Sequence, residues 1–378
     1  MAQKAASLPA PWDSLRDRFR VRRPGSCSVY GSGPDAQAFL RMLGKDGVHG
    51  NILHPQKTGY HAVLMENDRE TLNFYREHLQ QLSKGRIALA LESTEDFAPP
   101  RDNVHAISLS EVASTLFWGG YPAKPDEKLA FIGKDPLLSN LLRQGLCLNI
   151  FSPGQSIAYH IWGMKKTSGM IPGLDQMTMD KIVFHEHPWQ EEETLFAGMG
   201  RIVLCDTEEN NNAVMARLLK LPHCPVVYLY GNPGGGQISR ERGQPVIFGA
   251  REDTLRREIV LEEALLQRAK ALNDYYRRQY GGEPWERLEP FKRMSSISSA
   301  GYFPVLRRLF KVGISIETLA ELEHIRWSRF HYLHGWNYAP ERDNEKKLHN
   351  CLIPYSRLSE EEKQKDRNNV MLAIGQKL

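Results

Sequence analysis

Short apolar segments of strand length alternate with segments of helical periodicity from Ser26 onward, and this alternation limits the fold more than any other feature of the chain. Ser26–Tyr30 leads through a glycine turn into the helical pattern Ala36–Leu43. Strands that alternate with helices favour βαβ units, in which parallel strands form one sheet. This stretch contains further helix candidates, Asp68–Leu82 and Ser110–Leu116, and further strand candidates, Gly50–His54, His61–Met65, Arg86–Leu91 and Val104–Ser108.

The alternation begins again after Gly119–Lys128, a segment rich in glycine and proline that is typical of a boundary. We expect a second α/β unit there, consistent with a divergent duplicate of the first. Its helix candidates are Leu137–Leu142 and Asn211–Leu219, and its strand candidates are Leu129–Ile132, Leu146–Phe151, Lys181–Phe184, Arg201–Cys205, Val226–Tyr230 and Pro245–Phe248.

The last third of the chain has helical periodicity without strand candidates. Leu255–Tyr280 forms one long helical pattern that ends at two glycines, and Glu317–His334 forms another that ends at Gly335. The fold class is therefore α/β, with two parallel-sheet units followed by an α-rich module. The domain boundaries that we expect are 1–24 for an N-terminal arm, 25–122 and 123–254 for the α/β units, 255–314 for a helical connector and 315–378 for the C-terminal domain.

Charge and composition exclude several classes of protein. The net charge is +4, from 49 basic and 45 acidic residues among 378, which is too balanced to indicate a nucleic-acid-binding surface. No window reaches the roughly 18 uninterrupted apolar residues of a membrane span, and the N-terminus has no apolar signal region. The cysteines are odd in number and form no C-x-x-C pair, so we expect a cytoplasmic protein with free thiols.

A glycine turn after the first strand could hold a phosphate. Gly31, Ser32 and Gly33 followed by Ala36 give the pattern G-x-G-x-x-A, in which backbone N–H groups approach an anion at a helix N-terminus. NAD or another nucleotide is the cofactor that such a turn would bind. The second unit has only Gly133, with Asp135 where a second glycine would stand, and neither unit has a carboxylate at the end of its expected second strand to hold a ribose. A tight turn without ligand is the alternative.

The segment Arg201–Asn211 resembles the fourth-strand region of the regulatory TrkA-N (RCK) domains of potassium transport systems. In that region a strand ends in a small polar pair that is followed by acidic residues and an Asn. With the glycine turns, this makes both units resemble TrkA-N-type Rossmann domains, over roughly residues 25–250. The resemblance implies dinucleotide-linked regulation and dimerisation, so we expect a homodimer. It adds Gly133 and Asp206 to Gly31, Ser32 and Gly33 as candidate cofactor-binding residues.

The C-terminal residues carry a longer and more specific pattern. It reads LAELEHIRW over Leu319–Trp327, HGWNYAPERDNEKKLHNCLIPY over His334–Tyr355 and LSEEEKQKDR over Leu358–Arg367. This pattern resembles the RyR domain, the small repeat of ryanodine receptors that also occurs in bacterial proteins. The resemblance implies binding of a small ligand, such as an adenine nucleotide or a signal derived from a nucleotide.

The same residues make chemical sense as a binding site. Tryptophan and tyrosine rings offer flat faces on which a base can stack. Arg and Lys side chains bind phosphate, while His, Asp and Tyr add polar groups. The alternative is that the aromatic rings belong to the core of a small helical domain. The candidate ligand-binding residues are Trp327, Trp336, Tyr338, Arg342, Asp343, Lys347, His349 and Tyr355.

The sequence contains neither a nucleophile elbow nor a P-loop, so we assign no catalytic and no metal-ligating residue. The leading hypothesis is a non-catalytic cytoplasmic sensor whose RyR domain binds a nucleotide-like molecule in signalling or defence. An NAD(P)-dependent oxidoreductase that uses the Gly31–Gly33 turn is one alternative. A scaffold that contacts only other proteins is another.

Overall fold

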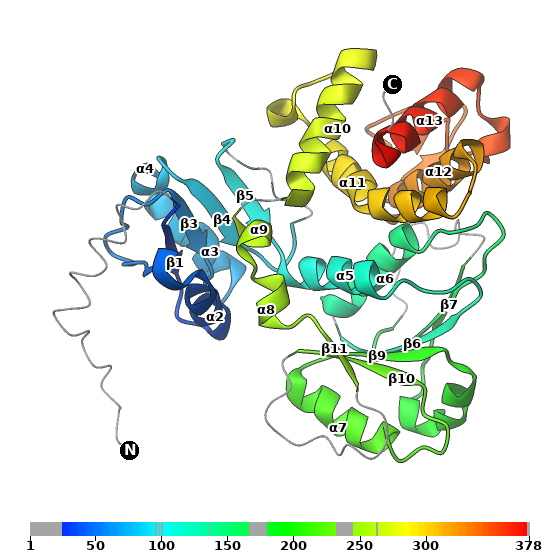
Figure 1. The fold of residues 1–378 in the computed structure, drawn as a ribbon, viewed down its shortest axis with the longest axis horizontal. Helices are drawn as coiled ribbons and strands as arrows, with labels where there is room; N and C mark the ends of the chain where they lie inside the picture. Colours follow the sequence, from blue (N-terminus) through cyan, green and yellow to red (C-terminus); the bar gives the residue numbers. More distant parts are fainter. Residues whose placement is uncertain are drawn as a thin grey trace. The chain divides into compact units, whose positions relative to one another are not determined.

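The computed structural model describes residues 25–94, 97, 99, 101–134, 136–165, 180–231, 245–261 and 264–375 (Figure 1). The chain divides into two compact units. The first contains the chain up to Leu109 together with Arg251–Ala264, and the second contains Ser110–Ala250 together with Leu265–Leu378. The expected N-terminal arm, residues 1–24, lies outside the described residues.

The first unit is a parallel sheet with helices. Its strands are β1 (Cys27–Tyr30), β2 (Gly47–His49), β3 (Tyr60–Val63), β4 (Arg86–Ala90) and β5 (Val104–Ile107), in the order β2-β1-β3-β4-β5. Its helices are α2 (Pro34–Leu43), α3 (Asp68–Glu77), α4 (Leu79–Leu82), α8 (Arg251–Thr254) and α9 (Arg257–Val260). Buried apolar side chains of the strands and of α3 form its core, among them Tyr30, Val63, Phe74, Ile87 and Leu89.

The expected strand at Gly50–His54 is wrong, because the second strand, β2, ends at His49. The Asn51 carboxamide oxygen accepts hydrogen bonds from the backbone N–H groups of Leu53 (2.9 Å) and His54 (3.1 Å). This turn takes the donors that a strand would need for its ladder.

The second unit contains a six-stranded parallel sheet. Its strands are β6 (Lys128–Gly133), β7 (Ala158–Trp162), β8 (Lys181–Phe184), β9 (Arg201–Cys205), β10 (Val226–Tyr230) and β11 (Val246–Phe248). Their order, β11-β10-β9-β6-β7-β8, is the 3-2-1-4-5-6 order of dinucleotide-binding Rossmann folds. The α5 (Leu109–Gly120), α6 (Leu137–Leu148) and α7 (Glu208–Leu218) helices and the 3-10 turns η3 (Trp189–Glu191) and η4 (Glu193–Gly198) accompany the sheet. The expected α/β class is confirmed in both units.

The expected strand at Leu146–Phe151 is also wrong. α6 continues to Leu148, and its side chains are buried on several sides, so its apolar residues form a run rather than a stripe. An apolar run of this kind does not distinguish a buried helix from a buried strand. The second strand of this sheet is instead β7, which the sequence analysis missed.

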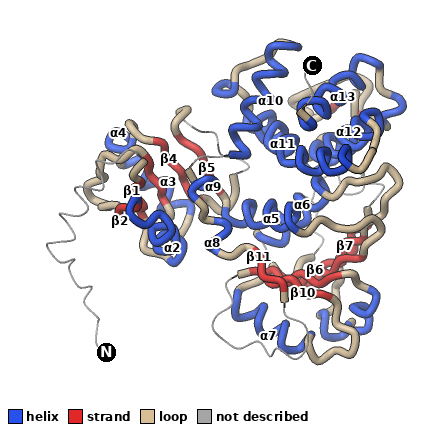
Figure 2. Tube along the Cα trace, in the orientation of Figure 1, coloured by secondary structure: helices blue, strands red, loops and turns tan. Residues whose placement is uncertain are grey.

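Helices dominate the rest of the second unit (Figure 2). They are α10 (Ala264–Tyr280), α11 (Pro290–Lys311), α12 (Ile316–Leu333) and α13 (Glu360–Ile374), with η5 (Trp285–Arg287), η6 (Tyr355–Arg357) and the short strand pair β12 (Asn337–Tyr338) and β13 (Leu348–His349). Ser315 and Ser359 cap α12 and α13 by accepting backbone N–H bonds. The expected single helix Leu255–Tyr280 is interrupted, since α9 and α10 are separate helices within it.

One apolar cluster joins the sheet of the second unit to these helices. It contains buried side chains from α5, β6, α6 and β7 as well as from α11, α12 and α13, among them Trp118, Phe131, Leu141, Tyr159, Tyr302, Leu319, Phe330 and Val370. No helix in the described ranges has both the length and the apolar character of a membrane span.

Candidate ligand-binding site

Three aromatic side chains lie on one face of α12. His324, Trp327 and His331 are spaced three and four residues apart, which places them on the same side of a helix. The Trp327 ring is 5.6 Å from the His324 ring in a stacked arrangement and 3.9 Å from the His331 ring. His349, from β13, meets Trp327 edge-on at 4.9 Å. Trp327 is half-buried, so part of its indole remains accessible.

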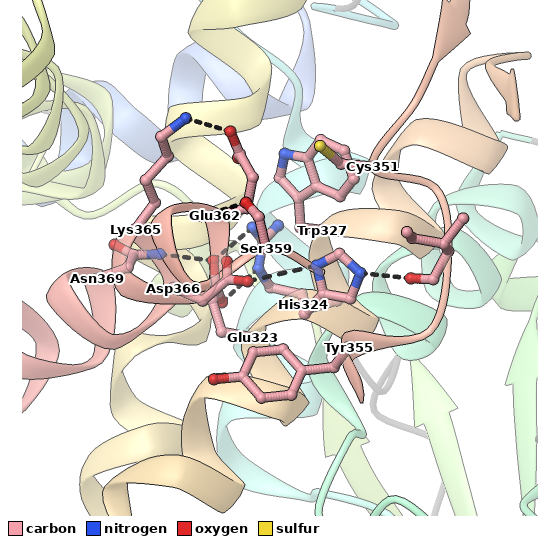
Figure 3. Close-up of polar contacts among 12 residues, drawn as sticks. Glu323, His324, Trp327, Cys351, Tyr355, Ser359, Glu362, Lys365, Asp366 and Asn369 are labelled. Atoms are coloured by element: carbon pink, nitrogen blue, oxygen red, sulfur yellow. Dashed lines mark hydrogen bonds and ion pairs between the residues drawn. The ribbon is translucent and has the colours of Figure 1, made fainter. Parts of the chain in front are cut away.

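His324 fixes this face to the neighbouring elements (Figure 3). Its Nδ1 lies 3.3 Å from the Asp366 carboxylate of α13, and its Nε2 lies 2.8 Å from the Ile353 carbonyl oxygen. Both neighbours of the ring are acceptors, and burial raises the pKa of Asp366. The contact between His324 and Asp366 therefore holds α12 against α13.

Charged side chains gather near the same face. Lys365 and Glu362 of α13 form an ion pair of 2.5 Å, drawn in Figure 3. The charges of Arg342, Glu362 and Lys365 all act on His349 and on Cys351. Burial raises the pKa of the Cys351 thiol to about 11, so this thiol is protonated at neutral pH.

The two buried histidines beside Trp327 are neutral at pH 7. The His331 Nδ1–H group donates to the Trp327 carbonyl oxygen at 2.9 Å, and burial lowers the pKa of His331 to about 3. The His349 Nδ1 accepts from the Cys351 backbone N–H at 3.0 Å, and burial, followed by the Arg342 charge, lowers the pKa of His349 to about 4. Arg342 and Lys365 are the cations whose charges act on His349, and Lys365 is paired with Glu362.

Two of the predicted ligand-binding residues lie deeper. Trp336 is only 6% exposed and stacks on Phe291 at 5.1 Å, and its indole N–H has no partner within the described residues. Tyr355 is buried, and its hydroxyl donates to Glu317 at 3.0 Å. Both side chains contribute to the interior of the domain beneath His349 and His324.

The end of β12 and the loop that follows it carry the remaining four. Tyr338 is 53% exposed, and the Arg342 guanidinium donates to Asn344 at 2.8 Å. Asp343 accepts backbone N–H bonds from Glu345 and Lys346, both at 3.1 Å, and pairs with the Lys346 ammonium at 3.0 Å. Lys347 has a φ of +54° and donates to the His334 carbonyl oxygen at 3.0 Å. Asp343 and Lys347 thus hold the loop, while the charge of Arg342 acts on His349.

The comparison with protein families decides the nature of this region. Residues 311–375 match the RyR domain. The predicted RyR resemblance is confirmed. No curated protein matches the chain. One solved structure with some similarity is the shikimate 5-dehydrogenase of Listeria monocytogenes in complex with shikimate and NAD, at 10% identity and a TM-score of 0.33, over 74% of this chain and 91% of that one. The Rossmann-like assignment rests on the strand orders of the two sheets.

The sequence analysis missed the residues of α13 that lie near the face of α12 formed by His324, Trp327 and His331. Asp366, Glu362 and Lys365 belong to an exposed-looking charged run, and nothing in that run indicates that Asp366 pairs with His324. The spacing of His324, Trp327 and His331 was the available signal, because it places three rings on one helix face.

The predicted cofactor-binding residues of the first unit form a tight turn. Gly31 has a φ of +131°, and a Cβ there would lie 2.0 Å from the Leu64 carbonyl oxygen. The Ser32 carbonyl oxygen accepts from Gln37 at 2.9 Å. Gly33 precedes α2 and has open space where a Cβ would stand. The geometry of the turn thus requires glycine at position 31, whereas no neighbouring atom requires glycine at position 33.

Gly133 and Asp206 come together in the second unit. Gly133 pairs with Cys205 across β6 and β9, and a Cβ at Gly133 would lie 2.3 Å from the Cys205 carbonyl oxygen. The Asp206 carboxylate lies 3.4 Å from the Lys134 ammonium. These residues stand at the carboxyl ends of the two strands where the strand order reverses, the usual ligand position of such sheets. Asp135 lies outside the described residues.

Proposed function

We propose that this protein is a non-catalytic sensor whose RyR domain binds a small nucleotide-like ligand beside Trp327. The observation that carries the proposal is that the half-buried Trp327 indole meets His349 at 4.9 Å, and that the charges of Arg342 and Lys365, with that of Glu362, act on the same histidine. A planar base stacked on Trp327 gains about 1–3 kcal/mol. Arg342 and Lys365 would bind the phosphate groups, with the exposed Tyr338 as a further contact.

The α/β units serve as the platform of this sensor. The resemblance to TrkA-N domains supports dimerisation through that platform, and the RyR domain supports a role in cytoplasmic signalling or defence. Ligand occupancy would then change the contacts of a dimer or of a partner protein.

Calorimetry of the full-length protein against ATP, cyclic nucleotides, NAD and ADP-ribose tests the proposal. Trp327→Ala should weaken binding about 10-fold or more, because the stacking surface is lost. Arg342→Ala should weaken it and reduce its salt dependence, whereas Arg357→Ala, an exposed cation on η6, should not. A folded wild-type protein that binds none of these ligands would contradict the proposal.

A second candidate is an NAD(P)-dependent oxidoreductase. The 3-2-1-4-5-6 strand order and the meeting of Gly133 with Asp206 favour a dinucleotide at the second sheet, and the Gly31–Gly33 turn favours one at the first. The residues that follow β7, Gly163 and Met164, supply no carboxylate for a ribose. NADH binding that survives Trp327→Ala would favour this candidate over the sensor.

A further inference from the structure

The face of α12 opposite Trp327 is bonded to the α/β part of the same compact unit. Arg329 lies two residues beyond Trp327, roughly 200° around the helix. Its guanidinium is buried and donates to the Leu146 carbonyl oxygen at 2.9 Å and to the Asp180 carboxylate at 2.7 Å. One helix thus presents a candidate ligand contact on one side and a buried ion pair on the other.

Asp180 connects this ion pair to the sheet. Its second carboxylate oxygen accepts the backbone N–H of Ile157 at 2.9 Å, directly before β7 begins. Two further side-chain bonds reach the same region: Tyr302 of α11 donates to the Ile150 carbonyl oxygen at 2.5 Å, and Arg143 of α6 donates to the Leu333 carbonyl oxygen at 3.0 Å. We call residues 146–157 the connecting segment; it contains the last three residues of α6 and the chain that leads from them to β7.

The contact between α12 and the connecting segment leaves a buried hydrogen-bond donor without an acceptor in the described part of the chain. Arg329 Nη2 is a buried donor that has no partner among the residues described. Buried donors without acceptors are rare in folded proteins and favour rearrangement, because an arrangement that satisfies them lowers the free energy. Because the bonds of Arg329 cross from α12 to Leu146 and Asp180, a displacement of α12 alters this contact.

We propose that α12 is a coupling helix: a change beside Trp327 is transmitted through the Arg329–Asp180 pair to the connecting segment and to the start of β7. The identity of the triggering ligand rests on the proposed function, whereas the coupling itself is a property of the fold. The property that should change is the stability of the connecting segment. This segment precedes β7, which pairs with β6, the strand that ends at Gly133.

Hydrogen exchange of the full-length protein without ligand tests the coupling directly. Trp327→Ala should raise the exchange rate of amides in residues 146–157 at least about threefold, since the pair loosens when α12 shifts. Trp327→Phe is a milder variant if the alanine variant unfolds, and Arg357→Ala is the exposed control. In an Asp180→Asn background, the same Trp327 substitution should add no further change in that segment. Unchanged exchange in 146–157, or an equal effect without the ion pair, would overturn the proposal.

A second arm separates the coupling from the proposed function. ATP and ADP-ribose at saturating concentration should change exchange in residues 146–157 of the wild type but not of Asp180→Asn. Binding without any change in that segment would overturn the coupling and leave the sensor intact. Absence of binding would overturn the sensor, while the ligand-free arm would still decide the coupling.

Discussion

At the scale of single residues, two tryptophans that look alike in the sequence have different surroundings. Trp327 is half-buried beside charged groups, whereas Trp336 is buried against Phe291. Both stand in the same motif, and the sequence predicts both as stacking faces. Burial places Trp336 in the interior of the domain, whereas under the proposed function Trp327 is the ring that meets the ligand.

Trp336→Ala should lower the free energy of unfolding by about 3–5 kcal/mol, because it removes a large buried ring and leaves a cavity. Urea denaturation measures this loss. Arg357→Ala, at an exposed position, should stay within about 0.5 kcal/mol of the wild type. A Trp336→Ala protein of full stability that has lost ligand binding would instead make Trp336 a direct contact.

His331 and His349 should make stability depend on pH. Their folded pKa values, about 3 and about 4, lie below the value of about 6.5 for an unfolded histidine. The unfolded state therefore binds more protons, and the free energy of unfolding should fall as the pH falls from about 6.5 to about 4, by up to about 1.4 kcal/mol per pH unit for each histidine.

Denaturation of wild type and His331→Gln across this range isolates the histidine effect, because both proteins share the same carboxylates. The slope should be shallower in the variant. Parallel slopes would mean that His331 titrates alike in the folded and unfolded states.

At the scale of elements, the glycine turn after β1 contains one glycine that the fold requires and one that it does not. Gly31→Ala should destabilise the first unit by more than about 1 kcal/mol, because φ is +131° and the new Cβ would meet the Leu64 carbonyl. Gly33→Ala, at φ −67° in open space, should change stability by less than about 1 kcal/mol, because the loss of unfolded-state entropy is opposed by the poor fit of alanine at the N-cap of α2. Thermal unfolding compares the two, and equal losses would contradict this account of the turn.

Most strands and helices could be predicted from the sequence, because alternating short apolar segments and glycine turns are local signals. The end of α6 could not, since a helix buried on several sides has no polar stripe that marks its period. Part of the candidate site could also be predicted from the sequence, because Trp327, Arg342 and His349 belong to one long motif. The Arg329–Asp180 pair was not, since 149 residues separate its partners and only the folded chain brings them together.

At the scale of the whole molecule, the RyR domain shares its apolar core with the second α/β sheet, so the two should unfold together. Scanning calorimetry should show no separate RyR transition. Arg329→Met should lower the transition of this joint unit, since removing one partner of a buried pair costs about 3–5 kcal/mol. Gly31→Ala should lower only the transition of the first unit. A distinct RyR transition in the wild type would contradict a shared core.

The two sheets correspond strand by strand. Without β8, the second sheet has the same arrangement as the first, and β1 and β3 take the places of β6 and β9. In both sheets a glycine at the carboxyl end of the first of these strands lies close to a carbonyl at the same end of the other, Gly31 against Leu64 and Gly133 against Cys205. Natural selection should therefore keep both glycines in descendants of this chain whether or not a nucleotide ever binds there. Their persistence would then reflect the close approach of two strands rather than a cofactor.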